Sequence, residues 1–147
     1  MDTEATHTEA MDTEATRKLV EQFLDARSAA DVGRIAAVLA NDAVWRLPVS
    51  ATFGPFEGRD AVATALSGGV TGSLFDTSTI RRDVHKVIVD GDTAVVQQRQ
   101  SATTLEGREY VNEYCWVYTC RDGKIARLEE YADTLHAARI FGTVASA

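Results

Sequence analysis

Residues 111–119 alternate between two kinds of side chain, and this alternation limits the possible folds more than any other part of the sequence. One face of the predicted strand comprises Asn112, Tyr114, Trp116 and Tyr118, and the other comprises Val111, Glu113, Cys115, Val117 and Thr119. The Asp122-Gly123 pair then provides a tight turn that tolerates positive φ, and residues 125–131 return antiparallel. The last third of the chain is therefore predicted to be a meander of two-faced strands.

The rest of the chain places helical patterns before strand patterns. Helices are expected at residues 15–27, from residue 31 onward and at about 60–66, strands at 43–47, 80–89 and 93–104, and a short final helix after Asp133. Helices followed by runs of antiparallel strands indicate an α+β fold, with the helices on one face of a curved sheet.

Length and charge restrict the class of protein further. A chain of 147 residues with 45% hydrophobic content supports one domain with a substantial core. The net charge of −7 and the dispersed basic residues argue against nucleic acid or an anionic membrane as a partner, because both need a concentrated basic surface. No apolar run reaches the roughly 20 residues of a membrane helix, and the acidic N-terminus is unlike a signal peptide. We expect a cytoplasmic protein that binds a neutral or apolar small molecule.

The first residues repeat themselves. MDTEAT occurs at residues 1–6 and again at 11–16. We interpret residues 1–14 as a disordered, duplicated leader, residues 15–143 as the single domain and residues 144–147 as a tail.

Four segments carry a resemblance to a known family: NDAVWRLP, FEGRDAVATAL, VDGDTAVVQQRQ and DGKIARLEEYADT. In their order and spacing, over about Arg17 to Gly142, the chain resembles the SnoaL-like branch of the nuclear transport factor 2-like superfamily. The resemblance implies a cone-shaped half-barrel with a curved mixed or antiparallel sheet, about three N-terminal helices and a short C-terminal helix. It also implies a deep apolar pocket and commonly a homodimer formed through the sheet. Members include polyketide cyclases, steroid isomerases, dehydratases, limonene epoxide hydrolases and non-catalytic binders, so the fold alone does not decide the activity.

The resemblance also points to residues. Arg99 and Asp133 match an arginine and a final-strand aspartate of the limonene epoxide hydrolase pattern, but Ser101 stands where that pattern has its second acid. Leu47 stands where ketosteroid isomerases carry their proton-shuttling aspartate. SnoaL-type cyclases use a carboxylate and a histidine, and Asp133 with His85 supplies those residue types.

Asp133 and Arg99 are the candidate catalytic residues. Asp133 is expected to point into the cone as an acid or base, with helix N-capping as its alternative role. Arg99 is expected to face the pocket and hold Asp133 ionised, with an outer ion pair to Glu113 or Glu129 as the alternative.

Six further residues are candidate substrate contacts: Trp45, Asn112, Tyr114, Trp116, Tyr118 and His85. The aromatic side chains combine an apolar body with a polar group, as pocket walls do, and plain core packing is the alternative for them. Asn112 needs a partner if it faces a core, and a ligand carbonyl is one candidate. No cluster of closely spaced ligands suggests a metal site, and no glycine pattern suggests a nucleotide cofactor.

These features lead to three functional hypotheses. The first is a cofactor-independent enzyme that acts on an apolar, oxygenated small molecule of polyketide, terpene or steroid type by cyclisation, isomerisation, dehydration or hydrolysis. The second is a cyclase that works mainly by the shape of its pocket, without an essential acid or base. The third is a non-catalytic binding or interaction module, which the substitutions at Leu47 and Ser101 favour.

Overall fold

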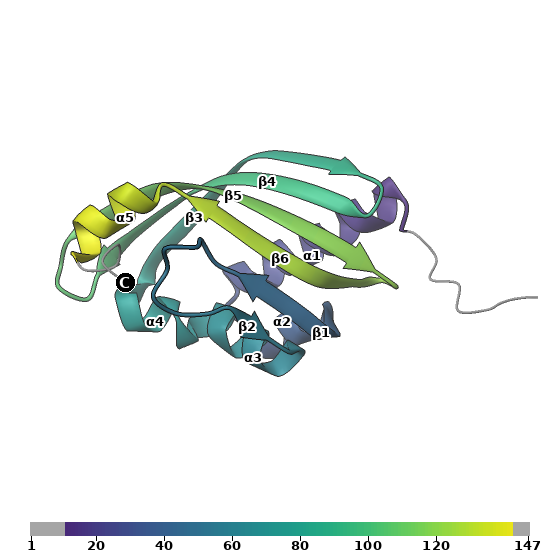
Figure 1. The fold of residues 1–147 in the computed structure, drawn as a ribbon, viewed down its shortest axis with the longest axis horizontal. Coiled ribbons are helices and arrows are strands. Elements are labelled where there is room, and N and C mark those ends of the chain that lie inside the picture. The colour runs from purple at the N-terminus through teal and green to yellow at the C-terminus, as the bar shows by residue number, and fades with distance from the viewer. Residues whose placement is uncertain (1–10, 143–147) are drawn as a thin grey trace, which may run out of the picture.

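The computed structural model describes residues 11–142, which form five α-helices and six strands in that range (Figure 1). The helices are α1 (Thr13–Ser28), α2 (Val32–Ala37), α3 (Arg59–Thr64), α4 (Thr71–Leu74) and α5 (Thr134–Phe141), with a π-helical turn, η1 (Ala65–Gly69), after α3. The strands are β1 (Leu39–Arg46), β2 (Phe56–Glu57), β3 (Phe75–Asp90), β4 (Thr93–Thr104), β5 (Glu109–Arg121) and β6 (Lys124–Ala132). No helix within residues 11–142 is long and apolar enough to cross a membrane.

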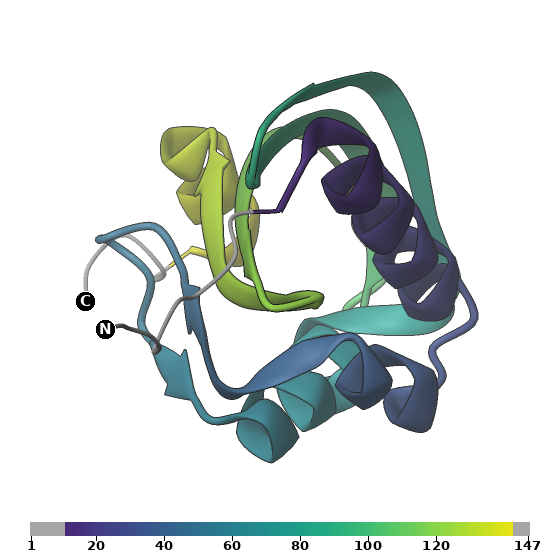
Figure 2. The same ribbon diagram turned by 90° about the vertical axis from the view of Figure 1, so that its right-hand side faces the viewer.

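The strands form one mixed sheet in the order β2-β1-β6-β5-β4-β3. β1 and β6 are parallel, and all other neighbours are antiparallel. Figure 2 shows the sheet curving round α1, with α2 and α3 in blue and teal at the bottom of the view and α5 apart from them at the upper left. The predicted α+β half-barrel, with N-terminal helices and a short C-terminal helix, is confirmed.

The concave face of the sheet and α1 enclose the core. α1 buries Leu19, Val20 and Phe23, and the Phe23 ring meets Tyr118 of β5 at 5.3 Å between centroids. Alternate residues of β4 and β5 point inward, as the period of two requires. Val96, Trp116 and Tyr118 are at most 1% exposed, so the concave face is the core face of both central strands.

Several boundaries differ from those expected from the sequence, and the reason is clear for two of them. α1 begins at Thr13 because the Asp12 side chain caps it, accepting a hydrogen bond from the backbone N–H of Ala15 at 2.7 Å. The first helix thus begins two residues before the predicted start at residue 15, and the first ten residues of the predicted leader and residues 143–147 lie outside the described range. β1 begins at Leu39, four residues earlier than expected, because its start pairs with Ile125 of β6.

A β-bulge in β6 sets the direction of its side chains. Cys120 of β5 lies opposite Ile125, whereas Thr119 lies opposite Arg127, so Ala126 is an extra residue in β6. Beyond the bulge the even-numbered side chains face the concave side, as Leu128, at 0% exposure, demonstrates. Simple alternation from Ile125 would instead have turned the odd-numbered residues inward.

Candidate active-site cavity

A cavity of about 110 Å³ opens at the wide end of the cone, between the concave face of the sheet and the helices. It is bounded by the end of α1, by the loop that follows β1, by α4 and α5, and by inward side chains of β4, β5 and β6. Its lining comprises Arg27, Trp45, Leu47, Pro48, Ser50, Ala51, Phe53, Val70, Thr71, Leu74, Phe75, Gln100, Tyr110, Tyr114, Trp116, Glu130, Ala132, Thr134, Ala137 and Phe141. Most of this surface is apolar, so the few polar groups stand out.

Aromatic rings form one wall. Trp45 of β1 lies 5.9 Å from Trp116 of β5 and 5.3 Å from Phe56 of β2, measured between ring centroids. The indole N–H of Trp116 is buried and has no hydrogen-bond partner among the described residues, whereas that of Trp45 lies near enough to Glu130 to lower the pKa of its carboxyl. The wall is therefore flat and apolar, with one free donor.

Glu130 is the one carboxylate in the lining. It follows the bulge of β6 by four residues and lies directly opposite Trp116. Burial raises its pKa to about 7, although the positive charge of Arg27 and the nearby indole of Trp45 each lower it. It remains partly accessible because its carboxylate opens onto the cavity, and it forms no ion pair with any of residues 11–142. A carboxyl group with this pKa exchanges a proton near neutral pH.

A chain of hydrogen bonds orients a tyrosine hydroxyl at the cavity. Asn112 donates its amide hydrogen to the hydroxyl of Tyr110 at 2.8 Å, and that hydroxyl lies 2.6 Å from the hydroxyl of Tyr114. Burial raises the pKa of Tyr110 and, more strongly, that of Tyr114, so both remain protonated at neutral pH. When the Tyr110 hydroxyl donates to that of Tyr114, the Tyr114 proton is free for an oxygen atom in the cavity.

One arginine lines the cavity, and a second lies behind it, bound to the lining residue Gln100. Arg27, in the last turn of α1, is only 6% exposed, and its guanidinium carbon lies 4.8 Å from the centre of the Trp116 ring. Arg82 of β3 donates from Nε to Oε1 of Gln100 at 3.2 Å. Burial lowers the pKa of both, that of Arg82 to about 9 with a contribution from Arg27. Arginine side chains carry a positive charge in proteins.

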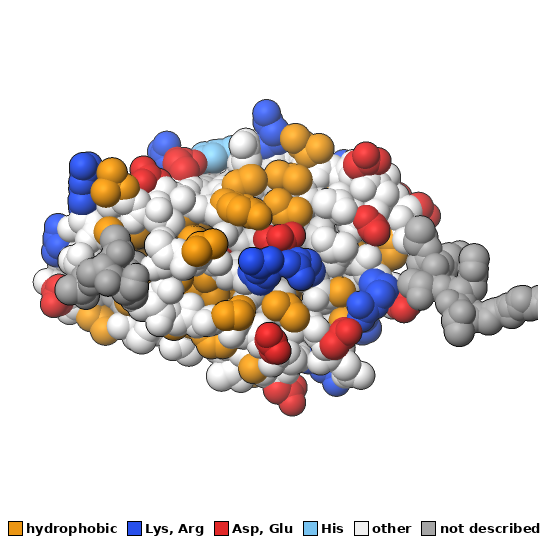
Figure 3. Space-filling view, viewed as in Figure 1, with side chains coloured by type: hydrophobic (Ala, Val, Ile, Leu, Met, Phe, Trp, Pro, Cys, Tyr) orange, Lys and Arg blue, Asp and Glu red, His pale blue; other side chains and the backbone are white. Residues whose placement is uncertain are grey.

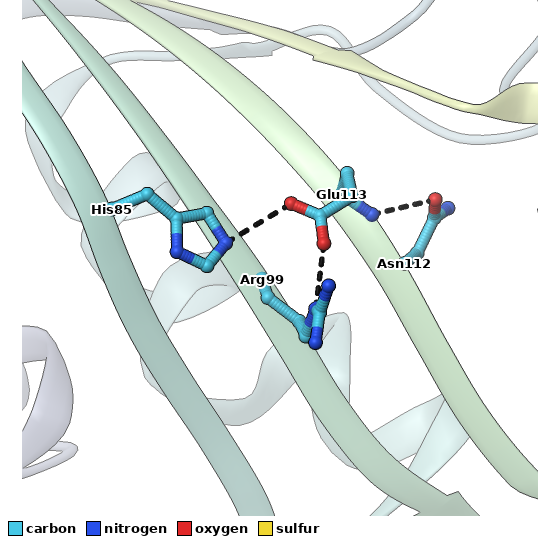
Figure 4. A network of polar contacts seen from close by, with 4 residues as sticks. All are labelled: His85, Arg99, Asn112 and Glu113. Carbon is cyan, nitrogen blue, oxygen red and sulfur yellow. Dashed lines mark hydrogen bonds and ion pairs between the residues drawn. The ribbon is translucent and has the colours of Figure 1, made fainter.

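Arg99 and His85 do not face the cavity, contrary to expectation. Both bind Glu113 on the outer face of the sheet: Nε of Arg99 lies 2.6 Å from one carboxylate oxygen and Nε2 of His85 lies 3.2 Å from the other (Figure 4). Their side chains are 52% and 44% exposed. Arg99 points outward because its neighbours Gln98 and Gln100 occupy the inward positions of β4. The ion pair with Glu113, the alternative considered for Arg99, is the arrangement observed.

Asp133 also lies outside the cavity. The bulge in β6 turns Glu130 and Ala132 inward. The prediction from the sequence that Asp133 points into the cone is therefore wrong. Asp133 is exposed, and its carboxylate accepts a hydrogen bond from the backbone N–H of His136 at 3.0 Å, capping α5. Arg99, Asn112 and Asp133 therefore do not converge in one cavity.

The other predicted contacts divide into two groups. Trp45, Tyr114 and Trp116 line the cavity, whereas Tyr118 packs against Phe23 deeper in the core. Asn112 is 4% exposed and lies behind the lining, where protein groups satisfy it. Besides Tyr110, it bonds the backbone carbonyl of Asp133 at 3.1 Å and accepts from the backbone N–H of Glu113 at 2.8 Å (Figure 4).

Sequence reasoning missed Glu130 and Arg27. Arg27 gave a signal, since it continues the buried stripe of the first helix at i+8 from Leu19. Glu130 gave none, because only the bulge places it inside. Within residues 11–142, no group of three His, Cys, Asp or Glu side chains is arranged to hold a metal ion.

The model of the SnoaL-like domain family matches residues 20–128, and the chain belongs to this family. Its fold is that of the nuclear transport factor 2-like superfamily. A nuclear transport factor 2-like protein of unknown function from Burkholderia pseudomallei superposes with a TM-score of 0.75 at 22% identity, covering 85% of this chain and 95% of that one.

Two other solved structures share the fold, one of an enzyme of named activity and one crystallised with a ligand. An epoxide hydrolase from Mycobacterium tuberculosis, similar to limonene epoxide hydrolase, gives a TM-score of 0.68 at 20% identity, covering 88% of this chain and 98% of that one. TerC, crystallised with polyporic acid, gives a TM-score of 0.72 at 20% identity, covering 90% of this chain and 99% of that one. None of the curated proteins matches this sequence. At these identities the likeness establishes the fold alone.

Proposed function

We propose that this protein is a cofactor-independent enzyme that moves a proton on an apolar, oxygenated small molecule held in the cavity. The substrate would be of polyketide, terpene or steroid type, and the reaction a cyclisation, isomerisation, dehydration or hydrolysis. The single observation that carries the proposal is Glu130, an unpaired carboxylate in an apolar cavity whose pKa is about 7. Such a group serves as base or acid at neutral pH, and perturbed carboxyls of this kind cluster at functional sites.

The surrounding side chains have complementary roles in this proposal. The Tyr114 hydroxyl donates a hydrogen bond to a carbonyl, hydroxyl or epoxide oxygen, and its link to Tyr110 keeps it in place. Trp45 and Trp116 hold the apolar part of the substrate against the wall. Proton abstraction beside a carbonyl, with the oxygen held by Tyr114 and the proton taken by Glu130, is the step that the geometry supports best.

The test is a Glu130→Gln variant, assayed with a panel of hydrophobic ketones, alcohols and epoxides by product detection in mass spectrometry. We expect turnover to fall by about a hundredfold or more, because a general acid or base contributes about 10²–10⁴ in rate. Glu129→Gln is the matched control, since Glu129 makes the same change on the outer face, where it pairs with Arg127 at 3.6 Å. Full turnover by Glu130→Gln would contradict the proposal and favour a cyclase that works by shape.

A second part of the proposal concerns assembly. We propose a homodimer formed through the outer face of the sheet. Ile88, Val95 and Val117 form an apolar row across β3, β4 and β5 on that face, and Tyr131 beside it is 55% exposed. Figure 3 shows hydrophobic side chains gathered over this face next to charges of both signs. A two-fold interface needs such a self-complementary surface.

A further inference from the structure

Arg27 is a buried cation that makes no close ion pair with any of residues 11–142, although the carboxyl of Glu130 lies near enough to interact with its charge. Its side chain lines the cavity and is 6% exposed, and its Nε has no hydrogen-bond partner among those residues. Buried charges in proteins are ordinarily paired and hydrogen-bonded, because an unpaired buried charge loses its hydration without compensation. The arrangement is therefore incomplete in the absence of a ligand.

The contacts that Arg27 does make leave its hydrogen-bond donors free. The Trp116 ring covers one face of the guanidinium, and the end of α1 adds a favourable dipole. Both stabilise positive charge, but neither accepts a hydrogen bond in the plane of the guanidinium, where its N–H groups point. Nε of Arg27, buried and without a partner among residues 11–142, is thus a donor that a ligand oxygen could satisfy.

The charges that face the interior are predominantly positive. Arg27 and Arg82 are cations, and Glu130 is the one carboxylate in the cavity lining. Because burial raises the pKa of Glu130 to about 7, it is largely neutral below that pH and offsets only part of the positive charge above it. Tyr110, Tyr114, Tyr118 and Cys120 also face inward and are uncharged near neutral pH, since burial raises the pKa of each.

We propose that the ligand of this cavity carries an anionic oxygen group, a carboxylate or an enolate-type oxygen, and that Arg27 binds it. The inference rests on the proposed function in taking the cavity as the ligand site, and it adds the charge of the ligand. The guanidinium presents paired N–H donors that match two oxygens of a carboxylate, while the tryptophan wall holds the apolar body. The preferred molecules are therefore apolar acids, not the neutral compounds that the composition of the chain suggests.

The test compares two probes of one shape and different charge, trans-cinnamate and trans-cinnamamide. Their binding to the full chain is measured at pH 6 by isothermal titration calorimetry, with Glu130 mostly protonated. We expect the wild type to bind cinnamate about tenfold or more tightly, as for a charge-assisted hydrogen bond, and Arg27→Met to bind both probes alike. Arg99→Met loses the same charge on the outer face and is expected to keep the preference, and Arg27→Lys to keep part of it.

Each result decides the matter. Equal binding of the two probes by the wild type, a preference that survives in Arg27→Met, or no binding of either probe would overturn the inference. Circular dichroism establishes whether each variant is folded, and Arg27→Lys provides a second reading if Arg27→Met is not. Equal binding would leave the proposed function standing, because proton transfer by Glu130 needs no anionic ligand. Unchanged turnover in Glu130→Gln would overturn the proposed function and leave the anion preference standing.

Discussion

At the scale of single residues, Glu130 links stability to the proposed chemistry. Its pKa rises from an ordinary value of 4.5 to about 7 on folding, because the folded cavity disfavours the charged form. Between these values the folded state binds more protons than the unfolded state, so the free energy of unfolding falls as pH rises through that range. The residue thus lowers stability at neutral pH, as functional residues commonly do.

Glu130→Gln should therefore be more stable than the wild type at pH 8, and the advantage should shrink at pH 5. The difference in unfolding free energy between the variant and the wild type should grow by up to about 3 kcal/mol from pH 5 to pH 8, because the pKa of Glu130 differs between the folded and unfolded states. Urea denaturation at both pH values measures it. Glu129→Gln, on the outer face beside Arg127, is the matched control, and equal behaviour of the two variants would contradict the buried position assigned to Glu130.

Tyr114 and Tyr118 make a second matched pair. Tyr114→Phe loses the hydrogen bond to Tyr110, so unfolding free energy should fall by about 1 kcal/mol and turnover by about tenfold to a hundredfold. The buried Tyr118 hydroxyl has no partner among residues 11–142, so Tyr118→Phe should be neutral or stabilising by up to about 1 kcal/mol. Chemical denaturation and product assays measure the stability and turnover of both variants. A larger loss of stability or turnover in Tyr118→Phe than in Tyr114→Phe would contradict the prediction.

At the scale of elements, the bulge in β6 separates what could be predicted from what could not. The strands, the Asp122-Gly123 turn and the inward stripe of β5 follow from alternation and turn chemistry, and the structure has them. Nothing in the sequence around Ala126 predicts a bulge. The bulge nevertheless reverses which side chains of β6 point inward, so Glu130 faces the cavity and Asp133 does not. Arg99 was misplaced for a different reason, because a polar face on β4 suits an open outer surface as well as a wet pocket.

Asp133 is expected to act through its helix. Asp133→Ala removes the cap of α5 and should lower unfolding free energy by about 1 kcal/mol, whereas Asp133→Asn should lose much less, since asparagine caps as well as aspartate. Chemical denaturation of the two variants gives the difference. Should Asp133→Asn stay folded but lose turnover, the catalytic role expected from the sequence would return to Asp133.

At the scale of the whole molecule, the sheet has one face covered by helices and one uncovered face. The covered face holds the cavity, and the uncovered face holds the Arg99–Glu113–His85 cluster and the apolar row. Arg99, a catalytic candidate from the sequence, and His85, a candidate contact, thus lie on the surface where the proposed dimer forms. The strand pattern predicts two faces, but which of them the helices cover depends on packing between distant segments.

Val117→Lys places a charge in the middle of the uncovered face and should convert a dimer into a monomer. Burying an unpaired lysine ammonium in an apolar interface costs several kcal/mol, on the order of the affinity of a modest dimer. Light scattering coupled to size-exclusion chromatography gives the mass. Val49→Lys is the control, because Val49 is 98% exposed in the loop after β1. A wild type that is monomeric at all concentrations would rule out the dimer.

The most direct measurement is a carbon-13 NMR titration of the glutamate side-chain carboxyls, with the Glu130→Gln spectrum used to assign the Glu130 resonance. We expect this resonance to titrate near pH 7, because burial in the cavity disfavours its charged form. Titration of Glu130 near 4.5, its ordinary pKa, would mean that the carboxyl is well solvated and would remove the basis for its role in proton transfer.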